Sequence, residues 1–185
     1  MTNHRILTLS RIVGLMLLAS TTATLARSAE IQDPPLARVR SDSSAIAEVI
    51  RQASERSILF RRLVARIDAT DGLVYVDEGK CGHGVRACLT LSVQVAGPHR
   101  LLRILVESIR RQNTCDLMAS IGHELWHAIE LLGQPKVTNY SSAYSFFQRE
   151  GPNGGGHVPF ETQAAVRTGF EVGREVCVTA GREGS

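Results

Sequence analysis

The chain has 185 residues, of which 21 are Lys or Arg and 18 are Asp or Glu, and its formal net charge is +3 at pH 7. This length suits one domain with a single hydrophobic core. The small charge, with no block of Lys or Arg, argues against a nucleic-acid-binding protein.

The first 26 residues have the order of a secretory signal peptide. MTNHRILTLSR carries two arginines and no acid, IVGLMLLA is apolar, and STTATLA is small and polar. This order predicts export, with cleavage after Ala26 and with Ala23 and Ala29 as alternative sites. The apolar run is too short to span a bilayer comfortably, so no membrane span is expected in the mature chain; a retained anchor is the alternative.

Removal of this segment leaves 159 residues and a formal net charge of +1, because Arg5 and Arg11 leave with it. The mature chain is predicted to consist of a flexible leader over 27–41, where two prolines prevent a helix, and a single domain over 42–185. Export implies a periplasmic or extracellular location in a bacterium.

Four cysteines remain in the mature chain. An even number in an exported protein favours disulfides. Cys81 and Cys88 bracket the short loop GHGVRA, so their pairing closes a small ring. Cys115 and Cys177 would then pair by elimination. The alternative for the first pair is a second metal site with His83, for which no fourth ligand is visible.

Residues 43–68 have the hydrophobic period of a helix. The apolar positions three and four residues apart are Ile46, Val49, Ile50, Ala53, Ile58, Leu59, Leu63 and Ile67. One long helix or two short ones fit this pattern, which ends at Asp71-Gly72.

The period then changes to that of strands. LVYVD (73–77) alternates, and so do ACLTLSVQVA (87–96) and LLRILVE (101–107). The turn residues Gly97-Pro98-His99 predict that the last two strands form an antiparallel hairpin. The apolar face of the first hairpin strand would carry Leu89, Leu91, Val93 and Val95.

Three further helices are predicted. One covers about 114–132, and a short one covers 142–149. The last runs from about Pro159 to about Cys177, where Gly169 and Gly173 weaken it. Together with the strands, these helices predict an α+β domain with an antiparallel or mixed sheet packed on helices.

The stretch GHELWHAIE (122–130) carries the candidate chemistry. On a helix, His123 and His127 lie one turn apart on the same side, so both imidazoles can be directed at one metal ion. Glu124 points about 100° away and can instead take a proton from a water on that ion. Zinc lowers the pKa of such a water to about 7. The alternative, an exposed face with two surface histidines, fits poorly with the uncharged neighbours of the pair.

A catalytic zinc ion of this kind has three protein ligands. Glu130 would lie about 10 Å along the helix from His123, and three ligands on one straight helix cannot surround a metal. Glu130 is therefore expected to support His127 or to pair with an arginine, although direct ligation is an alternative.

Glu161, in PFETQAAVRTGF, is the favoured third ligand. It is expected to open the last helix, where Ala164 and Ala165 on its own face would let that helix approach the histidines closely. The alternative is a first-turn glutamate that complements the helix dipole.

SIGHELWHAIE followed by FETQAA resembles the zincin superfamily of metallopeptidases and most closely the gluzincin arrangement. It is also similar to small exported bacterial proteins with a His-Glu-Leu-x-His-Ala-x-Glu helix and a later Phe-Glu-Thr segment. The resemblance implies one zinc ion held by His123, His127 and Glu161, with Glu124 as general base. The third histidine of metzincins would fall at Gly133, which excludes that branch.

The resemblance also implies a helix-backed sheet whose edge strand binds an extended peptide or protein substrate, and 87–96 and 101–107 are both candidates for that edge. The oxyanion formed in peptide hydrolysis needs a donor, for which Tyr144, Tyr140 and His157 are candidates. The sequence therefore predicts a secreted zinc metalloendopeptidase. The alternative is a zincin-like module that binds zinc or a partner without turnover.

Overall fold

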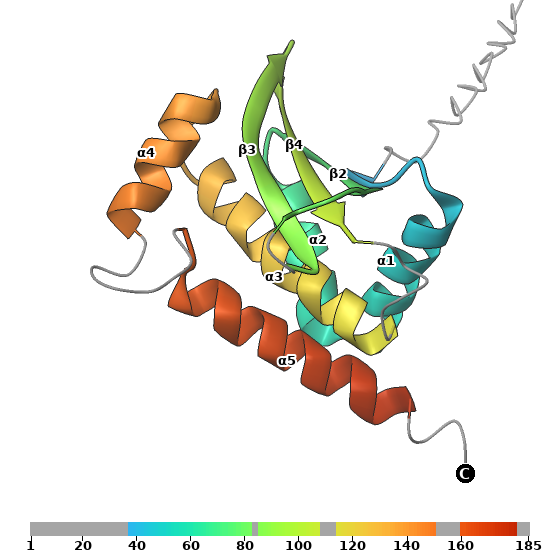
Figure 1. Cartoon of the computed structure of the whole chain (residues 1–185). Helices are drawn as coiled ribbons and strands as arrows, with labels where there is room; N and C mark the ends of the chain where they lie inside the picture. The colour runs from blue at the N-terminus through green and yellow to red at the C-terminus, as the bar shows by residue number, and fades with distance from the viewer. Residues whose placement is uncertain (1–36, 83–84, 108–113, 151–159, 181–185) are drawn as a thin grey trace, which may run out of the picture. The chain divides into compact units, whose positions relative to one another are not determined.

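The computed structural model describes residues 37–82, 85–107, 114–150 and 160–180. Over these residues the chain is a mixed α+β fold, in which five helices accompany a four-stranded sheet (Figure 1). The predicted signal peptide over 1–26 and the leader up to residue 36 lie outside the described residues. Within the described residues, no helix is long and apolar enough to cross a membrane.

The first helical stretch is two helices, α1 (Ser44–Arg56) and α2 (Ile58–Asp68). The break is at Ser57, whose backbone is extended and whose hydroxyl accepts a hydrogen bond of 2.9 Å from the backbone N–H of Phe60. The same hydroxyl donates to Glu175 at 2.6 Å, so the start of α2 is tied to the C-terminal helix. Ser57 therefore ends α1 and caps the start of α2.

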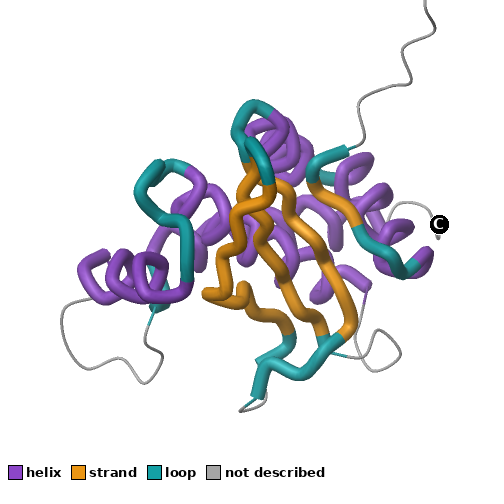
Figure 2. Tube along the Cα trace, turned by 90° about the horizontal axis from the view of Figure 1, so that it is seen from above, coloured by secondary structure: helices purple, strands orange, loops and turns teal. Residues whose placement is uncertain are grey.

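The sheet has the strand order β1-β2-β4-β3. The strands are β1 (Val39–Arg40), β2 (Gly72–Glu78), β3 (Ala87–Ala96) and β4 (His99–Val106). The β3–β4 pair is antiparallel, which confirms the predicted hairpin, whereas β2 runs parallel to both β1 and β4. This order puts β3 at one edge of the sheet, so of the two candidate edge strands 87–96 is at an edge and 101–107 is not. Figure 2 shows the strands side by side from above.

Two predictions about these strands were wrong. The domain does not begin at residue 42, because β1 lies inside the predicted leader and Val39 is buried opposite Val74 of β2. Two residues are too short for a periodic signal. In addition, the register of β3 is irregular between Thr90 and Gln94, which leaves Val93 buried but Val95 57% exposed. A bulge of this kind interrupts the alternation of faces that the sequence suggests.

The helix α3 (Thr114–Leu132) lies at the centre of the fold. It packs against β3 and β4 on one side and against α5 (Gln163–Ala180) on the other. Every second residue of β2 and β4 is buried beneath the helices. The short helix α4 (Tyr140–Glu150) lies beside β3, as Figure 1 shows.

The C-terminal end of α3 is held by Arg100, whose side chain is 6% exposed. Its guanidinium donates to the backbone carbonyls of Leu131, Leu132, Gln134 and Val137. It also forms two hydrogen bonds to Asp71, at 2.7 and 2.8 Å. Because the last carbonyls of a helix have no partners within it, this contact both satisfies them and fixes α3 against β4.

Cys81 and Cys88 form the predicted disulfide, with their Cα atoms 5.7 Å apart. The competing metal site would also need His83, which lies outside the described residues. The predicted Cys115–Cys177 disulfide is not formed: the two side chains are hydrogen-bonded thiols between α3 and α5. Burial and contact with Cys115 raise the pKa of the Cys177 thiol to about 11, which disfavours the reactive thiolate.

Candidate metal centre

His123 and His127 lie on consecutive turns of α3, with their ring centroids 4.9 Å apart. The side chain of His123 lies against Gly169 in the C-terminal helix α5. The ring of Phe147 from α4 packs edge-on against His127 with centroids 5.3 Å apart. The pair is therefore a packed part of the fold, and the alternative of two surface histidines is wrong.

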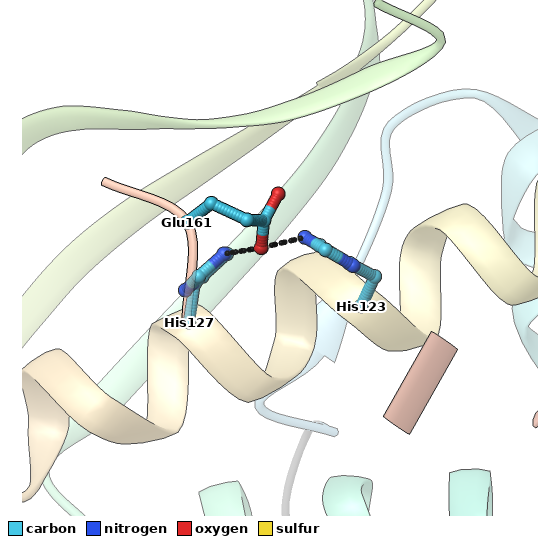
Figure 3. Close-up of side chains that lie close together, drawn as sticks. All are labelled: His123, His127 and Glu161. Atoms are coloured by element: carbon cyan, nitrogen blue, oxygen red, sulfur yellow. Dashed lines mark ion pairs between the residues drawn. The ribbon is translucent and has the colours of Figure 1, made fainter. Parts of the chain in front are cut away.

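Glu161 meets both imidazoles, as Figure 3 shows. Its Oε1 lies 3.1 Å from Nε2 of His123 and 3.4 Å from Nε2 of His127. Among the described residues, His123, His127 and Glu161 are the group whose ligand atoms lie close enough to hold a metal ion, all within 4.8 Å of one another.

The prediction that Glu161 opens the last helix was wrong, because α5 begins at Gln163. It lies in the preceding turn, where the hydroxyl of Thr162 accepts a hydrogen bond of 3.1 Å from the N–H of Ala165 and so caps α5. The carboxylate therefore approaches the histidines from an irregular segment and not from a helix face.

The donor set fits a divalent cation. Oε1 of Glu161 is buried at ion-pair distance from two imidazole nitrogens, but neither of them meets it in hydrogen-bonding geometry. A buried carboxylate oxygen without a donor is unfavourable unless it is paired or coordinates a metal. A cation bound by the two Nε2 atoms and by Oε1 would satisfy all three groups.

The electrostatics of His127 and Glu161 agree with this. Burial alone would lower the pKa of His127, but the hydrogen bond to Glu130 and the Glu161 carboxylate raise it to about 9. Burial would raise the pKa of Glu161, but contact with His123 and His127 lowers it to about 2. The site thus strongly favours a positive charge beside Glu161, which a metal ion could supply in place of a proton.

Glu124 lies beside the three candidate ligands and does not join them. Its Oε2 accepts a hydrogen bond of 2.7 Å from the N–H of Leu89 on β3, and its Oε1 lies 3.9 Å from Nε2 of His123. Burial raises the pKa of Glu124, while the positive charges of the histidines act in the opposite direction. The edge strand therefore holds this carboxylate within reach of the metal-binding position.

Glu130 supports His127, as its position on the helix predicted. Its Oε2 lies 2.8 Å from Nδ1 of His127. Its Oε1 accepts hydrogen bonds from Trp126 at 2.9 Å and from Thr162 at 2.8 Å. Both carboxylate oxygens are engaged, so the structure gives Glu130 no ligand position.

A cleft of about 620 Å³ opens from the metal-binding position. Its walls come from the start of β3, from α3 and from α5, and its lining includes His123, Glu124 and Glu161. Most of the remaining lining is apolar, including the ring of Phe170, which is 75% exposed. A ligand in this cleft would lie directly against the candidate catalytic groups.

The close approach of α3 and α5 depends on glycines of α5, in addition to the buried Ala165. A Cβ atom at Gly169 would lie 3.1 Å from Cβ of His123, and one at Gly173 would lie 3.2 Å from Cβ of Ala119. Sequence analysis treated Gly169 and Gly173 as weak points of the helix. Their four-residue spacing is the signal that would have identified a contact between helices.

The candidate oxyanion donors remain predictions. The ring of Tyr144 packs between those of Tyr140 and Phe160, at centroid distances of 6.0 and 5.2 Å. Both tyrosines are exposed on α4. His157 lies outside the described residues. Sequence analysis also missed Leu89, Phe160 and Thr162, which contact the site through a backbone N–H, a ring and a hydroxyl.

Comparison of the chain with family models, curated proteins and solved structures gives no match. Function is therefore inferred from the residues themselves. Two imidazoles and one carboxylate around a common point, with a second carboxylate close by and an adjoining cleft, can hold a metal ion and a proton acceptor beside a bound molecule.

Proposed function

We propose that this protein is an exported zinc-dependent hydrolase that cleaves peptide bonds. The observation that carries the proposal is the convergence of His123, His127 and Glu161, with the Glu124 carboxylate beside them. Two nitrogen ligands and one oxygen ligand are a typical catalytic zinc set, which leaves a fourth position for water or substrate.

A zinc ion bound there would supply a Lewis acid that polarises a substrate carbonyl and lowers the pKa of a bound water. Glu124 is the residue placed to accept the proton. The Leu89 N–H fixes its Oε2, while its Oε1 lies 3.9 Å from Nε2 of His123. Glu130 fixes the ring of His127 through Nδ1, which directs Nε2 to the metal.

The edge strand supports a polypeptide as the substrate. The carbonyl of Arg86 accepts a hydrogen bond from the N–H of Glu107. Because the backbone groups of an antiparallel strand point alternately toward and away from the paired strand, those of Ala87 and Leu89 point away from β4. These groups lie beside the site, as the bond from Leu89 to Glu124 demonstrates. An extended peptide could therefore pair with the outward groups of Ala87 and with the Leu89 carbonyl, while the Leu89 N–H holds Glu124.

An exported zincin-like enzyme is consistent with two further features. The Cys81–Cys88 disulfide suits an oxidising compartment, and the first 26 residues have the order of a signal peptide. The resemblance of the motifs to gluzincins supports the same proposal.

The test uses the purified mature protein and a diverse peptide library. We expect about one zinc ion per chain and cleavage at defined bonds. Glu124→Gln should retain zinc binding and lose cleavage. Glu55→Gln, at an exposed position of α1, should retain both. If the wild-type protein binds zinc but cleaves no peptide, the proposal fails and the chain is a zinc-binding module without turnover.

A further inference from the structure

The third candidate ligand is held by its two neighbours in the chain. Phe160 and Thr162 flank Glu161 in the turn before α5, so neither helix hydrogen bonds nor a helix face sets the direction of the carboxylate. Instead, the backbone conformation of this segment and the anchors of the flanking side chains must set it.

Phe160 has a backbone φ of +88°, in the left-handed region. Bulky side chains rarely adopt this conformation, because Cβ crowds the backbone, and it persists only where the surroundings enforce it. Among the described residues, Phe160 is the non-glycine residue with a positive φ. The strained position thus directly precedes a candidate metal ligand, which is where strain commonly serves a site.

The ring of Phe160 provides the enforcement. It packs against Tyr144 and Phe147 of α4, with centroids 5.2 and 6.2 Å away. Phe147 in turn packs against the ring of His127 at 5.3 Å. One aromatic cluster therefore contacts both a histidine ligand and the residue before the glutamate ligand.

Thr162 provides a second anchor on the other side of Glu161. Its side chain is buried, donates a hydrogen bond of 2.8 Å to Oε1 of Glu130 and accepts one of 3.1 Å from the N–H of Ala165. The other oxygen of Glu130 holds Nδ1 of His127 at 2.8 Å. Both neighbours of Glu161 are therefore connected to His127. Phe160 is connected through the ring of Phe147, and Thr162 is connected through the carboxylate of Glu130.

We propose that Phe160 and Thr162 are positioning residues that hold the Glu161 carboxylate against His127, with the left-handed backbone of Phe160 aiming it at the metal. The inference rests on the proposed zinc site and adds the elements that organise its third ligand. A ligand that is already in place loses little conformational freedom on binding, so its anchors raise metal affinity without contacting the metal.

The Thr162 anchor is tested by zinc affinity, measured by competition with a chromophoric chelator on the full mature chain. Thr162→Val should weaken zinc binding roughly 10- to 100-fold, as loss of an outer partner does at other metal sites. Thr162→Ser keeps the hydroxyl and should restore the affinity. Thr168→Val is the matched control, because Thr168 is a buried threonine on α5 whose hydroxyl donates to the carbonyl of Ala164 on the same helix at 2.8 Å.

The Phe160 anchor is tested by comparing two truncations that both remove the ring. Alanine retains the Cβ that disfavours a positive φ, whereas glycine adopts this conformation freely. We therefore expect zinc affinity to decrease in the order wild type, Phe160→Gly, Phe160→Ala. If the segment needed only stiffness, Phe160→Ala would bind zinc more tightly than Phe160→Gly, because glycine is the more flexible residue.

Absorption spectra of the cobalt-substituted proteins provide a second readout. The spectrum should change in Thr162→Val and Phe160→Ala and should stay unchanged in Thr168→Val. Equal zinc affinity of Thr162→Val and wild type, or binding by Phe160→Ala as tight as by Phe160→Gly, would overturn the inference while leaving the proposed function intact. Absence of zinc binding by the wild-type chain would overturn both.

Discussion

Nδ1 of His127 and Oε2 of Glu130 are joined by a hydrogen bond of 2.8 Å. This bond leaves Nε2 of His127 to face Glu161, so the Glu130 carboxylate, which could be taken for a third ligand in the sequence, instead orients the candidate ligand His127. The assignment follows from helix geometry, because Glu130 lies three residues beyond His127 on the same face.

Replacement of Glu130 should weaken the metal site without removing a ligand. Glu130→Gln keeps the size of the side chain but loses the charge that supports the imidazole, so we expect zinc affinity to fall roughly 10- to 100-fold with stoichiometry unchanged. Competition with a chelator measures this, with Glu150→Gln on α4 as control. Complete loss of zinc would instead indicate direct ligation by Glu130.

Gly122→Ala should destabilise the fold, because a Cβ atom there would lie 2.9 Å from Cγ2 of Val172 on α5. Alanine is worth about 1 kcal/mol more than glycine in a helix, but overpacking costs about 1–3 kcal/mol, so we expect a net loss of about 1 kcal/mol. Urea unfolding measures it.

The matched background for this substitution is Val172→Ala, which removes the contacting methyl groups. In that background Gly122→Ala should be neutral or stabilising. A stabilising effect of Gly122→Ala in the wild-type chain would show that α3 and α5 are not packed as closely as the structure indicates.

The Asp71–Arg100 pair should make stability depend on acidity. The hydrogen bonds from Arg100 lower the pKa of Asp71, so this residue binds its proton less readily in the folded state than in the unfolded state. Its stabilising effect is therefore present above the unfolded pKa of about 3.9 and is lost as the pH falls through the lower folded pKa.

Urea unfolding of wild type and Asp71→Asn at several pH values tests this prediction. The substitution should lower the free energy of unfolding at pH 7, and the difference should shrink below about pH 4 as the wild-type carboxylate is protonated. Asp77→Asn is the comparison, because its partner Arg103 is exposed whereas Arg100 is buried. A difference that does not change with pH would contradict the role given to the Asp71 charge.

Much of the local structure could be predicted, because it depends on residues close together in the chain. Periodicity located α3 and the β3–β4 hairpin, and helix geometry brought His123 and His127 together. The same geometry correctly separated Glu130 from the ligands.

The contacts between distant segments could not be predicted in the same way. Nothing within β3 indicates that the N–H of Leu89 meets Glu124, which lies 35 residues later in the chain. The parallel pairing of β2 with β4 and the position of β1 likewise depend on long-range packing. Glu161 was predicted as the third candidate ligand, but its irregular backbone was not predicted, because the positive φ of Phe160 has no glycine to signal it.

The central claim is that one zinc ion is held by His123, His127 and Glu161, and metal analysis of the purified mature protein tests it most directly. The account predicts about one zinc ion per wild-type chain and strongly reduced binding in Glu161→Ala, while Glu171→Ala, on the exposed face of α5, keeps the wild-type affinity. Zinc affinity in Glu161→Ala equal to that of wild type would contradict it.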